Sequence, residues 1–398
     1  MMLSDFVDKL EVKDIRFDLC WAYGNLLREI PKRLGTNIAL DAAVNAITTT
    51  ASDLSLGYKS PEALVRYGHA LTALRTCLDD PVSSQSSSTL CAIYLIWICQ
   101  TWIGIEPEYN CGHGSGIVQI LANAPYRDSK DPFDTMLLMT LSGPVIFESI
   151  FNPEVQLNPW VKEWVMEQEK PLIENAETTK NTGQPQAGRI MSCLVRLPEF
   201  MRYNPDTIWE LRQNYQAVQA TSKVMRERLS EAATAMKSGV PAAPPFKNPR
   251  AMIRVAPMRI HAFYQRTFSI LLALEIILNG LLRAYSPEDY VLEVENDQLT
   301  REIIDLSLEG SIWKPIGAGW VPVCLISAWG ATMDPARKTQ IEKVWDESWA
   351  EISHHSLPFA ASSIGDTFDQ LRLAAFRGKS MSPYRVPSPY GVPTTTAL

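Results

Sequence analysis

The string Gly112-His113-Gly114-Ser115-Gly116 is the strongest candidate for local chemistry in this chain. A phosphate-binding G-x-G-x-x-G loop requires glycine at position 117, which is Ile117 here. A nucleophile elbow G-x-S-x-G requires glycine at the position of His113. Neither motif is complete, so we interpret the string as a glycine-rich turn that leads into a helix over residues 117–122.

Residue types that ligate metals are present but scattered. Cys111 and His113 form an isolated C-x-H pair, whereas structural zinc needs about four ligands in paired spacing. His354 and His355 follow a predicted amphipathic helix, where they suit its C-terminal dipole. His261 is expected on a helix surface or hydrogen-bonded in the core. We therefore predict no metal site and no cofactor.

No pattern typical of an active site is complete either. An all-helical enzyme of the terpene-cyclase type needs an aspartate-rich D-D-x-x-D magnesium box, and Asp79-Asp80 begins one, but position 83 is Ser83. The five histidines and many serines and aspartates are not placed together by their spacing. The prediction is a protein that is not an enzyme, with no catalytic residues.

Composition indicates a globular chain that lacks a dense basic run. The 398 residues are 46% hydrophobic and 20% charged, with a formal net charge of −7. A duplex-binding surface needs clustered Lys and Arg, so direct DNA binding is not expected. No C-x-x-C pair occurs, and the wide cysteine spacing favours buried thiols in a reducing compartment. The cysteines are Cys20, Cys77, Cys91, Cys99, Cys111, Cys193 and Cys324.

Export and membrane insertion are not expected. Residues 1–13 contain three acids, whereas a signal peptide has a basic start and an apolar stretch. The two longest apolar runs, 90–105 and 268–282, are interrupted by polar residues and are shorter than the roughly 20 apolar residues of a membrane span. We predict that both are buried helices.

Helix signals dominate the chain. Ser60-Pro61-Glu62 supplies a cap, a first-turn proline and a first-turn acid. The apolar residues that follow recur at alternating steps of three and four, which places them on one helix face: Leu64, Tyr67, Leu71, Leu74 and Leu78. Similar starts occur at Asp131-Pro132, Asp206, Ser286-Pro287-Glu288 and Asp334-Pro335.

These patterns predict an all-α fold of packed antiparallel helices. The best strand candidate, 312–326, is interpreted as a loop followed by a buried helix. Six tryptophans are expected in the core rather than in a cofactor site: Trp97, Trp102, Trp160, Trp164, Trp345 and Trp349.

Prolines suggest how the chain is divided. The stretch Gly239-Val240-Pro241-Ala242-Ala243-Pro244-Pro245 excludes a helix, because each proline blocks a backbone hydrogen bond. We predict a helical subregion over 1–238, a Pro-rich linker over 239–250, a second helical subregion over 251–377 packed on the first, and a disordered Pro-rich tail over 378–398.

The tail carries two possible signals. Its basic residues, with those just before it, are interpreted as a solvated tail, and nuclear import or partner docking is the weaker alternative: Arg372, Arg377, Lys379 and Arg385. Ser382 and Ser388 each precede a proline and could accept phosphate.

Three stretches together resemble the regulatory, or middle homology, region of fungal zinc-cluster transcription factors. The first is Tyr67 to Leu78, with a Tyr followed by Ala-Leu and spaced leucines. The second is Thr89-Leu90-Cys91-Ala92, followed by Glu106, by His113-Gly114-Ser115-Gly116 and by Ile120-Leu121. The third is Ala328-Trp329-Gly330-Ala331 with Asp334 and Arg337. In order and spacing they cover most of residues 40–350.

The resemblance has two departures. Asn110 stands where the family has an aromatic residue three positions before the histidine. The family's zinc cluster, which holds two metals with six closely spaced cysteines, is missing, since no cysteine lies between Cys20 and Cys77.

The resemblance implies a nuclear transcriptional regulator or coregulator, controlling a metabolic or secondary-metabolite gene cluster. Its partners would be other transcription factors, coregulators or a small-molecule effector, and sequence-specific DNA binding is not expected without the cluster. The alternative is a helical ligand-binding or scaffold protein with no role in transcription. Target genes, effector and oligomeric state are not encoded in any motif.

Overall fold

A computed structural model describes residues 2–104, 117, 131–151, 157, 159–167, 188–239, 256–349 and 356–377. Every regular element in these ranges is a helix, which confirms the predicted all-α class, and none of them is a strand. Several sequence predictions lie outside the described residues: the glycine-rich string at 112–116, the His354-His355 pair, most of the linker and the C-terminal tail.

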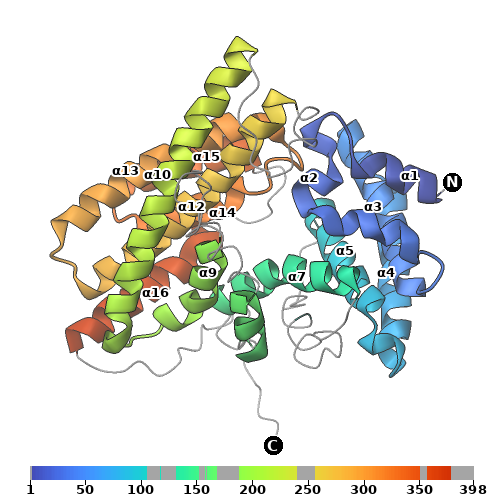
Figure 1. The fold of residues 1–398 in the computed structure, drawn as a ribbon, viewed down its shortest axis with the longest axis horizontal. Helices are drawn as coiled ribbons and strands as arrows, with labels where there is room; N and C mark the ends of the chain where they lie inside the picture. The colour runs from blue at the N-terminus through green and yellow to red at the C-terminus, as the bar shows by residue number, and fades with distance from the viewer. Residues whose placement is uncertain are drawn as a thin grey trace, which may run out of the picture.

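The described helices form two lobes (Figure 1). The N-terminal lobe contains, with the segment 159–167, the helices α1 (Met2–Leu10), α2 (Leu19–Tyr23), α3 (Ile38–Leu56), α4 (Pro61–Asp79), α5 (Ser87–Ile103) and α7 (Pro132–Phe151). The C-terminal lobe contains α9 (Gly188–Phe200), α10 (Ile208–Ser238), α12 (Pro257–Tyr285), α13 (Tyr290–Gly310), α14 (Val321–Ala331), α15 (Pro335–Trp349) and α16 (Leu357–Arg377). Short 3-10 helices, among them Ile15–Phe17, Asn25–Arg33 and Ser311–Trp313, connect some of them.

Each lobe has its own hydrophobic core. One cluster of buried residues is drawn mainly from α1 to α7, and the other mainly from α9 to α16. Buried residues up to 167 belong mainly to the first cluster and those from 188 onward mainly to the second, and α9 contributes to both. The helices that flank the predicted linker at 239–250, α10 and α12, pack against each other within the C-terminal core.

Helices α3, α4 and α5 pack on one another in the N-terminal lobe. The Ser60 hydroxyl accepts a hydrogen bond from the Ala63 amide and begins α4 as the sequence predicts. The predicted apolar face of α4 is wrong in part. Its buried stripe is Ala63, Tyr67, Ala70, Leu74 and Cys77, whereas Leu64, Leu71 and Leu78 are exposed.

The two longest apolar runs are buried helices, as the sequence predicts. Thirteen of the seventeen residues of α5 are buried. Helix α12 is long and apolar enough to cross a membrane by length and composition alone, and 89% of its apolar window is buried inside the protein. α12 packs against α10, α13, α14 and α16 and forms the centre of the C-terminal lobe.

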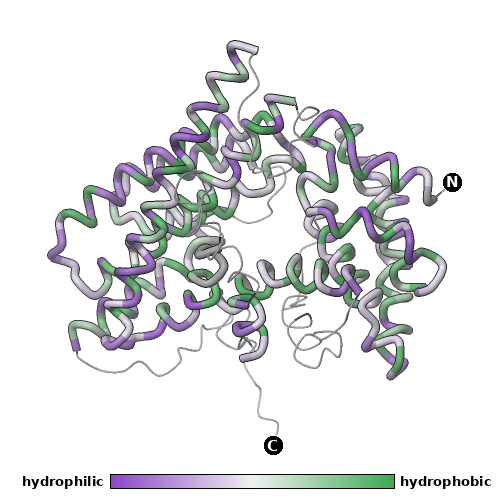
Figure 2. Tube along the Cα trace, viewed as in Figure 1, coloured by the Kyte–Doolittle hydropathy of each residue, from purple (hydrophilic) through white to green (hydrophobic). Residues whose placement is uncertain are grey.

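Hydropathy along the chain follows this arrangement (Figure 2). The outer helix α10 alternates between hydrophilic and hydrophobic residues, with Leu211, Tyr215, Val218 and Met225 on its buried face. Residues 312–326 form turns and the start of α14, which confirms the predicted loop and buried helix.

Hydrogen bonds from α12 hold the N-terminal segment of the first lobe against the second lobe. Arg259, at the start of α12, donates a hydrogen bond to the buried carboxylate of Asp18 at 2.7 Å and also to the backbone oxygen of Val12. Arg266, about two turns further on, donates to the backbone oxygen of Trp21 at 2.7 Å and lies over its ring. Burial lowers the pKa of Arg266.

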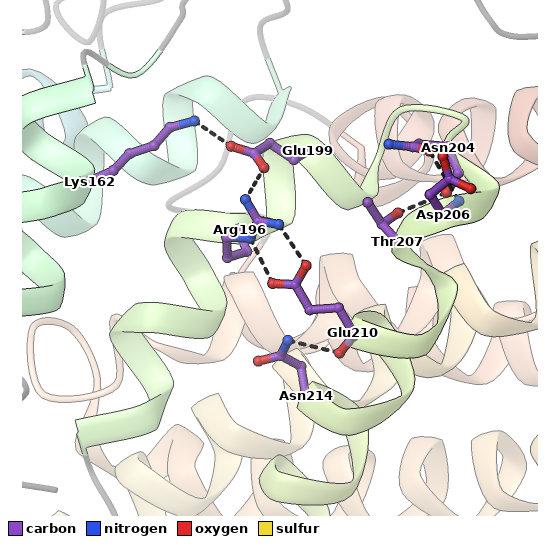
Figure 3. Close-up of polar contacts among 8 residues, drawn as sticks. All are labelled: Lys162, Arg196, Glu199, Asn204, Asp206, Thr207, Glu210 and Asn214. Atoms are coloured by element: carbon purple, nitrogen blue, oxygen red, sulfur yellow. Dashed lines mark hydrogen bonds and ion pairs between the residues drawn. The ribbon is translucent and has the colours of Figure 1, made fainter.

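A second polar junction lies at α9 (Figure 3). Lys162 of the N-terminal lobe donates to Glu199 at 2.5 Å, and Glu199 also accepts from Arg196. Arg196 in turn donates to both carboxylate oxygens of Glu210 on α10. The network therefore runs from the N-terminal lobe through α9 to α10.

Candidate ligand site

A cavity of about 360 Å³ lies where α3 ends, α4 begins and α5 ends. Ligand sites are typically 300–1,000 Å³ and mostly apolar, with a few polar groups that orient the ligand, so this cavity lies at the small end of that range. Its apolar lining includes Leu54, Pro61, Ala63, Leu64, Trp102 and Ile103, and its polar lining includes Thr50, Asp53, Tyr58, Lys59 and Ser60.

Asp53 shapes one wall of the cavity from the last turns of α3. Its side chain is only 6% exposed. The Oδ2 atom accepts hydrogen bonds from the Ser60 amide at 2.7 Å and from the Ser60 hydroxyl at 2.6 Å. Because Ser60 itself caps α4, the Asp53 carboxylate links the last turns of α3 to the first turn of α4.

Lys59, an exposed residue, lines the other side of the cavity. Its Nζ donates to the backbone oxygen of Ile103 in the last turn of α5 at 3.0 Å. This position suits a cation, because the last carbonyls of a helix carry partial negative charge. Gly57 and Gly104 end α3 and α5 with φ values of 72° and 68°, a left-handed conformation that favours glycine. The two helix ends can therefore turn sharply beside the cavity.

The aromatic wall is held in place from behind. The Trp102 indole nitrogen donates to the Tyr23 hydroxyl at 2.9 Å, and the two rings meet edge to face with centroids 5.6 Å apart. Burial raises the pKa of Tyr23, so the phenol stays neutral and serves as an acceptor. The wall is thus a rigid apolar surface, which suits a preformed site.

The arrangement can bind a small, mostly apolar molecule that carries a hydrogen-bonding group. One carboxylate and one ammonium belong to the lining, with hydroxyl groups from Thr50, Tyr58 and Ser60 and apolar side chains for the rest. The hydroxyl and carboxylate that pair in its wall, Ser60 and Asp53, also form the start of α4, where Ser60 caps the helix.

A second polar cluster lies between α10, α12 and α13. The Tyr215 hydroxyl donates to Glu295 at 2.7 Å and accepts from Asn279 at 3.1 Å. Nearby Glu275 is 5% exposed, one of its oxygens has no hydrogen-bond partner, and burial raises its pKa to about 7. Raised carboxyl pKa values are frequent at functional sites, but here most members bond to one another within packed helices, which fits a structural network.

The structure gives most of the singled-out residues structural roles. The Asp80 carboxylate accepts from the Ser83 amide at 2.8 Å and holds the turn after α4, which lowers its pKa. His261 is half-buried on α12, between the helix surface and the core positions that the sequence allows. Its Nδ1 has no hydrogen-bond partner, and burial lowers its pKa. Within the described ranges, no group of three or more His, Cys, Asp or Glu could hold a metal ion.

The aromatic and thiol predictions are confirmed where the structure describes them. All six tryptophans singled out in the sequence pack in or against one of the two cores. The six described cysteines are buried. Burial raises the pKa of Cys20 to about 11 and that of Cys91 to about 12.

Sequence reasoning missed the cavity and its two charged residues. Asp53 stands inside a predicted helix and Lys59 in a short turn, and neither belongs to a motif. A carboxylate seven residues before a helix-capping serine is the only local signal, and it becomes informative once the α3–α4 turn is known.

Comparison of the chain with protein-family models, with curated proteins and with solved structures finds no match. The function proposed below therefore depends on the residues and their geometry.

Proposed function

We propose that this chain is a transcriptional regulator or coregulator of the fungal type, which binds a small, mostly apolar effector between α3, α4 and α5. It acts in the nucleus on a metabolic or secondary-metabolite gene cluster, through other transcription factors or coregulators. The observation that carries the proposal is the cavity at the ends of these three helices.

The resembling stretches and the cavity share two helices but not their residues. Tyr67 to Leu78 lies in α4 and Thr89 to Ala92 in α5, whereas the cavity is lined by the start of α4 and the end of α5. Tyr67 and Leu74 are buried against α4's neighbours, and Thr89 and Leu90 are fully buried. These residues therefore belong to the packed core of the N-terminal lobe.

The third resembling stretch has a packing role in the other lobe. A Cβ atom at Gly330 would lie 2.8 Å from the side chain of Ile364, so glycine lets α14 approach α16 closely. Asp334 then accepts from the Ala336 amide at 2.9 Å and starts α15. The proposal gives this lobe the role of presenting surfaces to partners.

The proposal is tested in a strain that lacks the gene and expresses a tagged chain. We expect promoter association in chromatin immunoprecipitation, direct or through a partner, and transcripts that change on deletion. Leu54→Trp, at a half-buried position in the wall, fills the cavity and should leave promoter association intact while failing to restore the transcripts. Leu373→Trp, at an exposed site on α16, is the matched control. Absence of promoter association would refute the proposal.

The second candidate is a ligand-binding or scaffold protein with no role in transcription. The cavity suits it equally. Exclusion of the tagged chain from the nucleus, with unchanged transcripts on deletion, would select this candidate.

A further inference from the structure

One oxygen of the Asp53 carboxylate is left available in the cavity between α3, α4 and α5. Oδ2 accepts both hydrogen bonds from Ser60, whereas Oδ1 accepts none from any described residue. Oδ1 is not enclosed by protein atoms, in contrast to the partnerless oxygen of Glu275. Asp53 is only 6% exposed and lines the cavity, so its remaining accessible surface, which includes Oδ1, faces this space.

A carboxylate in this setting favours a positively charged donor. Asp53 forms no ion pair with a described residue. A hydrogen bond between an ammonium and a carboxylate is roughly twice as strong as one between neutral groups, and it gains further strength where little water screens the charges. An alcohol would leave the negative charge without a counter-ion, and an anion would be repelled. The available oxygen therefore selects an amine among small ligands.

The other charged residue of the lining does not compete for this role. Lys59 is exposed, and its Nζ already donates to the backbone oxygen of Ile103 at 3.0 Å. Bulk water and salt screen an exposed ammonium, whereas they screen a buried carboxylate much less. The charge that a ligand inside the cavity meets is therefore mainly that of Asp53.

The remainder of the lining fits an apolar body. Leu54, Trp102 and Ile103 contribute hydrophobic surface from the ends of α3 and α5. The Trp102 ring is held by its hydrogen bond to Tyr23, so it offers a preformed surface to a ring or a branched alkyl chain. An ammonium beside an indole also gains a cation–π attraction.

We propose that this cavity binds a small primary amine, whose ammonium group donates to Oδ1 of Asp53 and whose apolar body packs on Trp102. A volume of about 360 Å³ suits one aromatic ring with a short chain. The inference rests on the proposed function, because it names the chemical class of the effector. It is tested on the purified full chain, without any promoter.

Calorimetric titration near neutral pH with three probes of similar shape tests the class of ligand. The probes are phenylethylamine, phenylethanol and phenylpropionate, whose end groups are positive, neutral and negative. We expect phenylethylamine to bind with a dissociation constant on the order of 100 µM. Phenylethanol should bind about tenfold or more weakly, and phenylpropionate should not bind up to about 5 mM.

Asp53→Asn separates the charge of the site from its shape. The asparagine oxygen still accepts the hydrogen bonds from Ser60, so the start of α4 is retained. We expect the variant to bind phenylethylamine about tenfold or more weakly than wild type. It should bind phenylethanol as wild type does, which also reports that the cavity has folded. Asp305→Asn, at an exposed position on α13, is the matched control and should bind both probes as wild type does.

Three results overturn the inference. The first is phenylethanol or phenylpropionate binding as tightly as phenylethylamine, and the second is amine binding that Asp53→Asn leaves unchanged. Either one shows that the carboxylate does not select the ligand, and both leave the regulatory proposal standing. The third is failure of all three probes to bind at about 5 mM. The proposed function fails on a different result, the absence of promoter association of the tagged chain.

Discussion

Replacing Arg259 with methionine should loosen the N-terminal segment from the C-terminal lobe. Asp18 is 2% exposed, and its carboxylate receives one hydrogen bond from Arg259 at 2.7 Å and one from the Trp21 amide at 2.8 Å. The substitution removes the first bond and leaves a buried carboxylate with only the second. Breaking a buried ion pair costs about 3–5 kcal/mol. Because the Arg259 side chain is 23% exposed, we expect the lower end, about 3 kcal/mol.

Hydrogen–deuterium exchange of the peptide covering residues 10–23 measures this locally. A loss of about 3 kcal/mol corresponds to exchange about 100-fold faster in α2. Asp18→Asn should cost less, since asparagine still caps the Trp21 amide. The double variant Asp18→Asn/Arg259→Met should be more stable than Arg259→Met alone, because no charge is then left buried and unpaired.

The control is Arg66→Met, which removes an exposed ion pair between Arg66 and Glu62 on α4 and should change exchange in 10–23 very little. If Arg259→Met leaves exchange in α2 at the wild-type rate, or if the two substitutions add without coupling, then the ion pair does not fasten the segment and the reasoning fails.

Three further predictions follow from packing and burial. Gly330→Ala should lower stability by about 1–3 kcal/mol, because its Cβ would lie 2.8 Å from the Cγ2 atom of Ile364; thermal unfolding at the wild-type temperature would contradict this. Glu275 holds its proton to about pH 7 in the folded chain but only to about pH 4.5 when unfolded, so stability should fall as pH rises between these values. Urea unfolding of Glu275→Gln should lose that part of the pH dependence, and an unchanged slope would show that burial of this carboxyl is not its cause. The six described cysteines should react with a thiol reagent only after denaturant is added, and rapid labelling of the native protein at any of them would contradict their burial.

The helical class and many helix starts were predictable from local sequence. The serine cap before α4 and the Asp-Pro starts of α7 and α15 each supply backbone or side-chain groups that only a helix start requires. Continuous apolar runs also predicted burial, because α5 and α12 have no polar face to expose.

Which face of α4 is buried could not be predicted from the sequence alone. Its leucines and its smaller apolar residues form two adjacent stripes, and both satisfy the helical period. The core selected the stripe with Ala63 and Ala70, because alanine allows α3 and α5 to approach closely, and left the leucines exposed.

The ligand cavity and the lobe junctions depended wholly on the tertiary structure. Asp53 and Lys59 become neighbours of Trp102 only when α3, α4 and α5 bring their ends together. Arg259 meets Asp18 across 241 positions of chain. A local pattern records the period and capping of a helix, whereas contacts over such separations are set by how whole helices pack, and no single stretch of sequence contains that information.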